Sequence, residues 1–276
     1  MARTPDDFEE AMLDLLEEVR YATPSYLDEF NRHHLCREGA WVYALEHCVF
    51  GAHFPRWLAN VLGNCPILEV RKYLIENLYV EEVEDPTIIS GHHESLVDFA
   101  VALGLDRDYV MNYEGAPLTK IRAQYFEHVS RTRPWDEGFA AACSGEMTRG
   151  TKMHARIGNR AKTTRAMWAP LNLAERDLAH WDAAEEADCG EGGHGDRPYE
   201  LLKKYVTTRE RQDACLAAMR EWQAMTRMWQ DQVGAWAFEA AGLEPPSLTG
   251  RQPLPQPKRA ASARRARPGR TSGGSP

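Results

Sequence analysis

Apolar residues recur every three or four positions along almost all of residues 6–246, with only short breaks. This is the period of an amphipathic α-helix, whereas a half-buried strand would alternate apolar and polar residues. No alternating β-branched run of useful length occurs. The longest apolar stripe lies in residues 209–241 and consists of Cys215, Met219, Trp222, Met225, Trp229, Val233 and Trp236. The sequence therefore predicts an all-α domain whose core includes this Met and Trp stripe.

Proline and glycine divide this pattern into separate helices. Pro24, Gly63, Pro86 and Gly91 interrupt the apolar spacing, and Pro66 and Pro117 stand where a first helical turn accepts proline. A glycine-rich stretch at 189–195 is unsuited to a regular helix. We expect helices over residues 6–22, 25–62, 66–84, 92–103, 117–130, 134–150, 151–168, 171–188, 197–206 and 209–241, with a short one after Asp106.

Composition separates this helical domain, residues 6–245, from a tail, residues 246–276. The tail holds seven basic residues and no acid, and it is rich in Pro, Gly, Ser and Arg. Such a segment cannot bury enough apolar surface to offset the entropy cost of ordering, so we expect disorder. The overall charge is −8, so the body without its tail is more acidic still. An acidic body repels phosphates, and this argues against nucleic-acid binding.

Several functional classes are excluded by what the sequence lacks. It has no apolar run long enough to cross a membrane, and its acidic start does not resemble a secretory signal. Its six cysteines form no C-x-x-C pair, which predicts reduced thiols and a cytoplasmic protein. It also lacks H-E-x-x-H, G-x-S-x-G, G-x-G-x-x-G and Walker motifs.

An all-α bundle performs metal chemistry by projecting Glu and His side chains from facing helices into its interior. The sequence offers several such residues in apolar or small-residue surroundings. Glu46 lies in a strongly apolar stretch, where a buried acid needs a partner. Glu81 and Glu82 precede the break at Pro86, and two imidazoles follow it. Glu146 stands among small residues that leave space beside its carboxylate.

A further candidate segment combines imidazoles and acids in residues 180–194. It contains His180, Asp182, Glu185, Asp188 and His194. An acidic run of this kind, taken alone, is typical of a solvated helix face. Only its position after the other acids and imidazoles makes this segment a candidate for metal binding.

In this order the motifs resemble those of the heme-oxygenase-like dimetal oxidases. They are a lone Glu, then N-x3-E from Asn77, then H-x-E with F-x2-A-L-G-L, then a Glu, and finally a His-and-acid helix with H-G-D-x3-E-L-L-x2-Y. The likeness covers about residues 30–240. The superfamily, which is related to thiaminase-II-like proteins and pyrroloquinoline-quinone synthase, implies a seven-helix heme-oxygenase-like bundle. Its dimetal branch uses two irons to activate dioxygen.

The resemblance implies a set of metal ligands in this chain. Glu46 matches the first carboxylate, Glu81 the second and Glu146 the third, with Glu82 as the alternative to Glu81. For the first imidazole, the distance to Phe99 and Gly104 favours His92 over His93. The best match for the second imidazole is His180. The implied cofactor is therefore two Fe(II) ions per chain.

One part of the family pattern is altered here. The family reads H-x3-D-x2-H on its last ligand helix, but position 184 is Ala. Counting back from Leu202 places His194 at the second His of that motif. An insertion of one or two turns would explain both facts and would move the acid to Asp188 or Glu185. The surrounding glycines permit such an irregular helix.

The family relationship also implies reactants and partners. We expect dioxygen and a small amino-acid-like substrate, oxidised in a bacterial natural-product pathway by desaturation, C–H or N oxidation, or carbon–carbon cleavage. An external electron donor and a homodimer are both compatible with the sequence. A substrate carboxylate would need a cationic partner, for which Arg56, Arg160 and Arg165 are candidates.

Two other functions remain open at this stage. One is a metal-free thiaminase-like hydrolase, with Cys143 as nucleophile, or a cofactorless oxidase on the same fold. The other is a helical binding or scaffold protein without catalysis. The oxidase predicts converging Glu and His side chains, the hydrolase predicts Cys143 opening into a pocket, and the scaffold predicts Glu46 and Glu146 facing solvent or forming salt bridges.

Overall fold

A computed structural model of the chain describes residues 1–85, 88, 91–158, 165–189 and 193–259. Within these ranges the protein consists of helices and connections, and it has no strand beyond an isolated bridge between Leu105 and Arg259. The prediction of an all-α domain is therefore confirmed.

The helices follow the predicted order closely. The first half contains α1 (Pro5–Leu16), a π-helix (Glu17–Tyr21), α2 (Tyr26–His33), α3 (Arg37–Asn64), α4 (Leu68–Glu82), α5 (His92–Ala102) and α6 (Arg107–Met111). The second half contains α7 (Pro117–Thr132), α8 (Trp135–Met147), α9 (Thr151–Ile157), α10 (Arg165–Trp168), 3-10 turns (Ala169–Leu171 and Glu175–Leu178), α11 (Ala179–Cys189), α12 (Arg197–Tyr205) and α13 (Arg209–Ala240).

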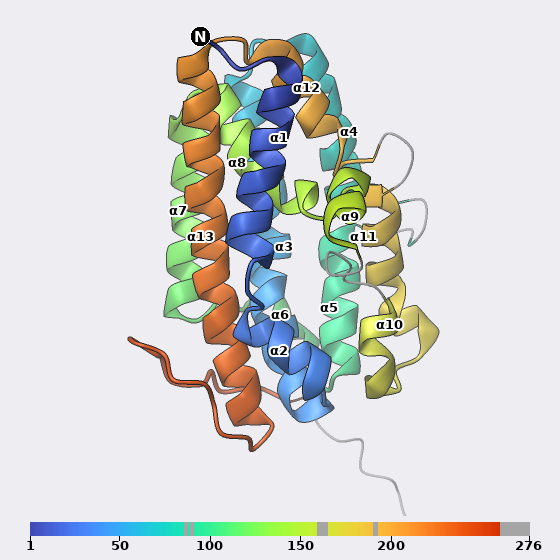
Figure 1. The fold of residues 1–276 in the computed structure, drawn as a ribbon. Coiled ribbons are helices and arrows are strands. Elements are labelled where there is room, and N and C mark those ends of the chain that lie inside the picture. The colour runs from blue at the N-terminus through green and yellow to red at the C-terminus, as the bar shows by residue number, and fades with distance from the viewer. Residues whose placement is uncertain (86–87, 89–90, 159–164, 190–192, 260–276) are drawn as a thin grey trace, which may run out of the picture.

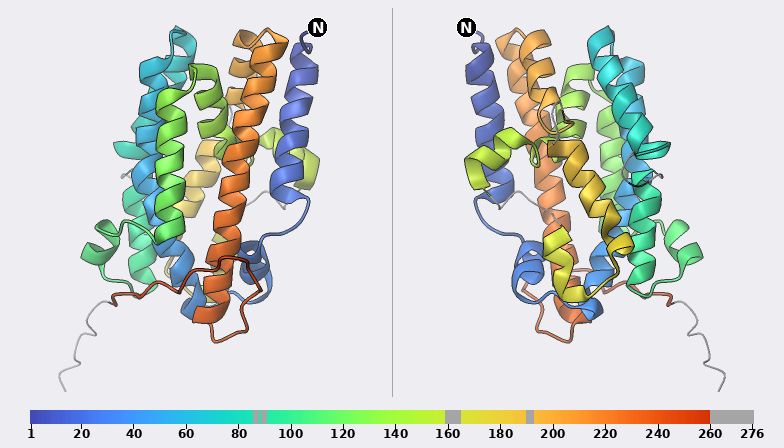
Figure 2. Two further views of the ribbon diagram at one scale, coloured as in Figure 1. Left: turned by 90° about the vertical axis from the view of Figure 1, so that its left-hand side faces the viewer. Right: turned by 90° about the vertical axis from the view of Figure 1, so that its right-hand side faces the viewer.

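Two long helices, α3 and α13, form the centre of the bundle. α13 packs against α8, α2 and α3, while α3 also packs against α7, α5 and α4. In Figure 1, α7, α8 and α13 lie on one side of α3, and α4, α5 and α11 lie on the other. Figure 2 shows the same bundle from its two sides. The side chains of α3 thus face two groups of helices.

Local signals explain where several helices begin. Thr4 caps α1 and Pro5 follows it in the first turn. Ser25 caps α2 through a capping box with Asp28, in which each side chain binds the other residue's backbone N–H. The predicted helix over 25–62 is in fact α2 and α3, because the backbone is extended at Cys36, the N-cap of α3. An extended residue cannot continue an α-helix.

The bundle encloses two apolar clusters. One joins α1, the second half of α3, α4, α7, α8 and α12 to the first half of α13, and it contains the parallel stacked rings of Phe126 and Trp222. The other joins α3, α5, α10 and α11 to the second half of α13, and it contains Trp168, Trp181 and Trp229. The predicted Met and Trp stripe of α13 therefore belongs to the core.

The first part of the predicted tail is attached to the bundle. Gln252 donates its backbone N–H to Gln232 and accepts a bond from Leu118 N at 3.1 Å, while its carbonyl accepts from Trp236 Nε1 at 2.8 Å. The guanidinium of Arg259 lies over the ring of Trp41. These bonds satisfy backbone groups that a disordered segment leaves to water, so the attached chain extends through Arg259. Residues 260–276 lie outside the described residues.

No helix in the described ranges combines the length and the hydropathy that crossing a bilayer requires. None of the six cysteines, all of which the structure describes, forms a disulfide.

Candidate metal centre

Six of the seven predicted ligands lie in two neighbouring groups inside the bundle, one around His92 and one around Glu146. Glu81 is in the last turn of α4, His92 begins α5, and Glu146 is near the end of α8. The other three, His180, Asp188 and His194, lie in α11 and in the turn that leads to α12. All are buried except His194, which is half-buried.

The α4–α5 side of the cluster is a charged triad. Nδ1 of His92 lies 3.1 Å from Oε1 of Glu81, and Nε2 lies 3.0 Å from Oδ2 of Asp85. Burial alone would lower the pKa of His92, but the two carboxylates outweigh it and raise the pKa to about 10. Without a metal, His92 is therefore an imidazolium that must lose a proton before it can act as a ligand.

This triad predicts a pH-dependent stability of the metal-free protein. Because the folded pKa of His92 lies above the ordinary value of 6.5, its contribution is complete below pH 6.5 and is lost as pH rises to about 10. We expect the free energy of unfolding of wild type, relative to His92→Gln, to fall by about 2–4 kcal/mol across this window. Urea denaturation at pH 6, 8 and 9.5 measures the difference. Parallel pH profiles for the two proteins would contradict it.

His180 connects the triad to α11. Its ring lies 5.9 Å from that of His92, measured between centroids, and its Nδ1 is 2.9 Å from Oγ of Ser95. Ser95 Oγ donates its own proton to the carbonyl of His92 at 2.8 Å, so it accepts from Nδ1–H of His180. Burial, together with the charge of His92, lowers the pKa of His180 well below 6.5. His180 is therefore neutral, with Nε2 as its unprotonated nitrogen.

Glu146, Asp188 and His194 form the second part of the cluster. Each offers a ligand atom, and these atoms all lie within 4.8 Å of one another. Asn77 Nδ2 donates to both carboxylate oxygens of Glu146, at 2.9 and 3.0 Å. The hydroxyl of Tyr73 lies 3.2 Å from Oε2 of Glu146 and from the carbonyl of His194. Two neutral donors thus hold Glu146 in place without neutralising it.

The electrostatics of this second part favour a bound cation. Burial and the charges of Asp188 and Glu81 raise the pKa of Glu146 well above 4.5. Burial also raises the pKa of Asp188 to about 6, although Arg149 pairs with it at 2.5 Å. Burial lowers the pKa of His194 to about 4, which leaves a neutral imidazole. Buried carboxylates that repel each other beside neutral imidazoles are a donor set that fits iron or manganese.

The turn that brings His194 back to the cluster depends on glycine. The backbone N–H of His194 binds the carbonyl of Ala187 at 2.9 Å, and that of Gly195 binds the carbonyl of Asp188 at 3.2 Å. A Cβ on Gly193 would lie 2.7 Å from the carbonyl oxygen of Asp188. Because the chain turns back this tightly, the side chains of Asp188 and His194 lie close together even though position 184 is Ala.

Glu46 is not brought to this cluster. Its carboxylate is fully buried and accepts hydrogen bonds from Tyr113 Oη and Thr119 Oγ1, both at 2.5 Å, and from Ala116 N at 3.3 Å. Burial raises its pKa, against the effect of these donors. The sequence predicted Glu46 to be the first carboxylate ligand of the metal centre, but in the structure it accepts hydrogen bonds from protein groups and lies outside the Glu146 group. The carboxylate links α3 to the start of α7, and all three of these partners are neutral donors.

The alternative ligands are also placed by the structure. Glu82 is exposed, whereas Glu81 reaches His92. His93 is half-buried, and its ring lies near Gly51 of α3. Asp182 pairs with Arg165. Glu185 is half-buried and is not one of the two residues, Asp188 and His194, whose ligand atoms converge with those of Glu146.

Sequence reasoning missed several residues that support the cluster. They are Tyr73, Asp85, Ser95 and Arg149, and Asn77 was noted only as part of a motif. Tyr73, Asn77 and Glu81 are spaced four residues apart on α4, which places them on one helix face. That spacing was a signal in the sequence for Tyr73. The signals for Ser95 and Arg149 exist only in three dimensions.

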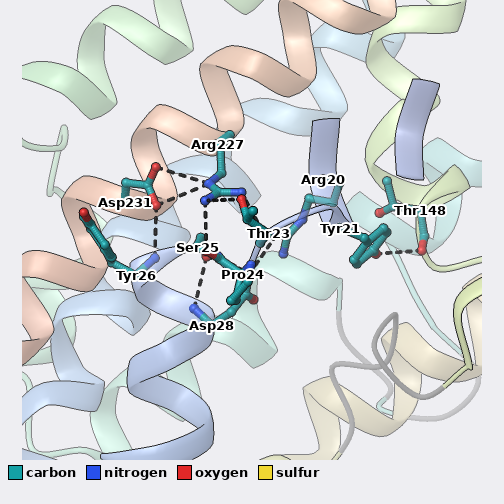
Figure 3. A network of polar contacts seen from close by, with 10 residues as sticks. All are labelled: Arg20, Tyr21, Thr23, Pro24, Ser25, Tyr26, Asp28, Thr148, Arg227 and Asp231. Atoms are coloured by element: carbon teal, nitrogen blue, oxygen red, sulfur yellow. Dashed lines mark hydrogen bonds and ion pairs between the residues drawn. The ribbon is translucent and has the colours of Figure 1, made fainter. Parts of the chain in front are cut away.

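A cavity of about 310 Å³ adjoins the cluster and is lined by Glu146 and Arg149. Its other walls come from the π-helix, α2, α3, α7 and α13. Two polar contacts hold the wall at residues 20–28: Arg20 pairs with Asp28 at 3.0 Å, and Tyr21 donates to the carbonyl of Thr148 at 2.9 Å. Figure 3 shows how these contacts connect the segment to the rest of the bundle.

The same segment is anchored to α13. Arg227 donates to the carbonyls of Thr23 at 2.7 Å and Pro24 at 2.9 Å, and it pairs with Asp231 (Figure 3). Asp231 in turn accepts the backbone N–H of Tyr26 at 3.0 Å. The wall of the cavity at residues 20–28 is therefore fixed to α8 through Thr148 and to α13 through Arg227.

Comparisons with known proteins agree with this fold. Residues 42–226 match the sequence model of a family described as iron-containing redox enzymes. A 4-aminobenzoate synthase from Chlamydia pneumoniae is 24% identical over 179 residues, which cover 65% of this chain and 73% of that protein.

Two solved structures are similar at low sequence identity. One is a domain of unknown function with a heme oxygenase-like fold from Shewanella denitrificans, with a TM-score of 0.62 and 16% identity over 83% of this chain and 90% of that one. The other is a TenA homolog from Pseudomonas syringae pv. tomato, with a TM-score of 0.60 and 12% identity over 83% and 91%. The predicted heme-oxygenase-like bundle is therefore confirmed.

Proposed function

Because this chain belongs to the iron-containing redox enzyme family, we propose that it is a dioxygen-activating oxidase with two Fe(II) ions per chain. The proposed ligands are Glu81, His92, Glu146, His180, Asp188 and His194. The observation that supports the proposal is that ligand atoms of Glu146, Asp188 and His194 lie within 4.8 Å of one another. Glu81, His92 and His180 form a second buried group, and the charge of Glu81 acts on Glu146. Glu46 is left out, because three donors already satisfy its carboxylate.

Residues around the ligands prepare them for this role. Ser95 holds Nδ1–H of His180 and so directs its unprotonated Nε2 to a metal. Asn77 and Tyr73 orient Glu146, and Arg149 orients Asp188. Iron, when bound, supplies the electrons and open coordination positions with which dioxygen is activated. The chain's own contribution is to place ligands, exclude water and position a substrate.

The substrate of this proposal is a small amino-acid-like molecule in a bacterial biosynthetic pathway. The cavity beside Glu146 has the size of a small-molecule site, at about 310 Å³. The Chlamydia pneumoniae relative is named for the synthesis of 4-aminobenzoate, a small amino acid. Where the substrate gives up only two electrons and dioxygen is reduced fully to water, an external donor would supply the other two electrons.

The rival functions receive less support. Cys143 is fully buried, and burial beside Glu146 raises the pKa of its thiol well above 9, so it is a poor nucleophile. A scaffold protein would turn Glu46 and Glu146 to solvent or to salt bridges, but both are buried and accept hydrogen bonds from neutral donors. A cofactorless oxidase gives no reason for burying Glu81, Glu146 and Asp188 together.

An anaerobic ferrous titration of the metal-free full chain tests the proposal. We expect two iron equivalents to bind, and subsequent mixing with dioxygen to oxidise both. In Glu46→Gln, which keeps an acceptor for Thr119 and Tyr113, the stoichiometry should remain two. Inductively coupled plasma analysis of desalted protein measures the bound metal. A loss of iron in Glu46→Gln would return this residue to the ligand set, and no saturable binding in wild type would refute the proposal.

A further inference from the structure

The cavity beside the metal centre contains a buried cation that has no anionic partner among the residues the structure describes. Arg122 of α7 is 5% exposed and lines this cavity. Its guanidinium carbon lies 4.5 Å from the ring centroid of Trp229, 5.0 Å from that of Phe126 and 5.3 Å from that of Phe50. The charged group is therefore enclosed by three aromatic rings from α3, α7 and α13.

Arg122 differs from the other arginines at this cavity. Arg20 pairs with Asp28, Arg149 pairs with Asp188, and Arg32 is exposed to solvent. Across the ranges that the structure describes, no carboxylate lies within ion-pair distance of Arg122, and its buried Nε has no hydrogen-bond partner. Burial lowers its pKa to about 9, which still leaves it protonated at neutral pH.

A buried, protonated guanidinium with an unsatisfied N–H donor is costly for folding. Aromatic faces attract it, but they do not accept its N–H groups as a carboxylate would. The fork of a guanidinium matches the two oxygens of a carboxylate, and this pairing is the strongest hydrogen bonding available to it. Such a residue in a cavity is explained when the cavity takes an anion.

The remaining lining defines what kind of anion fits. The lining combines polar residues with the aromatic rings of Tyr43, Phe50, Phe54, Trp222 and Trp229, of which Phe50 and Trp229 lie against the guanidinium of Arg122. His47, also in the lining, is neutral because burial and the nearby Arg122 and Arg149 lower its pKa to about 3. The walls beside Arg122 therefore suit a flat or apolar body and not a second charge.

We propose that Arg122 binds the carboxylate of a small substrate with an aromatic or similarly apolar body, and that this substrate lies in the cavity beside Glu146. The inference rests on the proposed function for the reaction, since it places a substrate next to the metal centre. Arg122 takes the role of carboxylate partner for which the sequence suggested three other arginines. Of these, Arg56 is exposed, Arg165 pairs with Asp182, and Arg160 lies outside the described residues.

The test compares a carboxylate with its neutral analogue. The full chain, loaded with ferrous iron under argon, is titrated with 3-phenylpropionate and with 3-phenylpropanamide. Calorimetry and the fluorescence of the cavity tryptophans report binding. We expect wild type to bind the acid at least tenfold more tightly than the amide. Arg122→Met should weaken acid binding by about 10- to 100-fold and leave amide binding unchanged, since hydrogen bonds to charged groups are lost.

Two further variants keep the test informative. Arg122→Lys retains the charge but not the pair of parallel N–H donors that a guanidinium offers to a carboxylate, so it should recover only part of the affinity for the acid. Arg56→Met removes an exposed arginine and should bind the acid like wild type. Circular dichroism checks that each variant is folded.

The outcomes separate this inference from the proposed function. Equal affinity of wild type and folded Arg122→Met for 3-phenylpropionate would overturn the role of Arg122, whatever the iron content. Failure of wild type to prefer the acid over the amide would do the same. Loss of acid binding in Arg122→Met with two irons retained supports both proposals. Arg122-dependent acid binding in a protein that takes up no iron would support the carboxylate site and refute the oxidase.

Discussion

Replacing Glu146 by Gln is expected to weaken iron binding by at least a hundredfold and to stabilise the metal-free protein at the same time. Loss of a residue that merely orients a ligand already costs 10- to 100-fold in metal affinity, so loss of the ligand itself should exceed this. Any iron-dependent oxidation should fall with it. Ferrous titration and thermal unfolding with and without iron measure the two effects.

The gain in metal-free stability follows from the charge of the buried carboxyl group. Burial, Asp188 and Glu81 raise the pKa of Glu146 in the folded state. For an acid with a raised folded pKa, stability is highest below the ordinary value of 4.5 and falls as pH rises above it. Gln removes this penalty and still offers an oxygen to Asn77. The Tm difference between variant and wild type should therefore grow from pH 5 to pH 7.

Asp136 provides a matched control. It is also a buried acid on α8, but it pairs with Arg211 at 2.5 Å and lies outside the metal cluster. Asp136→Asn should lower stability, because it leaves Arg211 without its partner, and it should leave iron binding unchanged. If Glu146→Gln instead lowered metal-free stability and kept its iron, Glu146 would be a structural acid of the same kind.

The helices could be predicted from the sequence because their determinants are local. Most helix boundaries could be predicted from the apolar spacing together with Pro66, Pro117 and the glycine breaks. The gap between α2 and α3 was missed because the apolar pattern continues through it, and only the extended backbone at Cys36 reveals the break. The attachment of Gln252 was missed because composition predicts a disordered tail but does not show that Gln232 on α13 offers a hydrogen-bond acceptor to it.

The site was predictable as a set of residues but not as a geometry. Order and spacing pointed to Glu81, His92 and Glu146 as polar groups that the fold would bury together. The same reasoning included Glu46, since apolar spacing shows that a residue is buried but not which donors surround it. Its partners Tyr113 and Thr119 lie about 70 positions further along the chain.

Arg122 could not be found by any local argument. Its sequence neighbourhood is an ordinary amphipathic helix with several basic residues. What makes it unusual is the enclosure by Phe50 from α3 and Trp229 from α13, which come together only in the folded bundle. That no carboxylate from the described part of the chain lies near it is likewise a property of the packing.

Gly234→Ala is expected to lower the stability of the protein by about 3 kcal/mol, with a fall in Tm of about 5–10 °C. Gly234 lies where α13 crosses the start of α2, and a Cβ there would overlap the backbone of Tyr26 and Leu27. Backbone atoms cannot rotate away as a side chain can, so the two helices must separate. Thermal and urea unfolding measure the loss.

The same separation should affect ligand binding. α2 contributes Leu27, Asp28 and Asn31 to the cavity wall, so a displaced α2 widens the cavity beside Arg122. Gly63→Ala is the control: it is also a glycine within a long helix, but a Cβ there meets nothing within 4 Å. Since Ala favours helix over Gly, this variant should gain up to about 1 kcal/mol. Equal stability of the two alanine variants would show that α2 and α13 do not cross as closely as the structure describes.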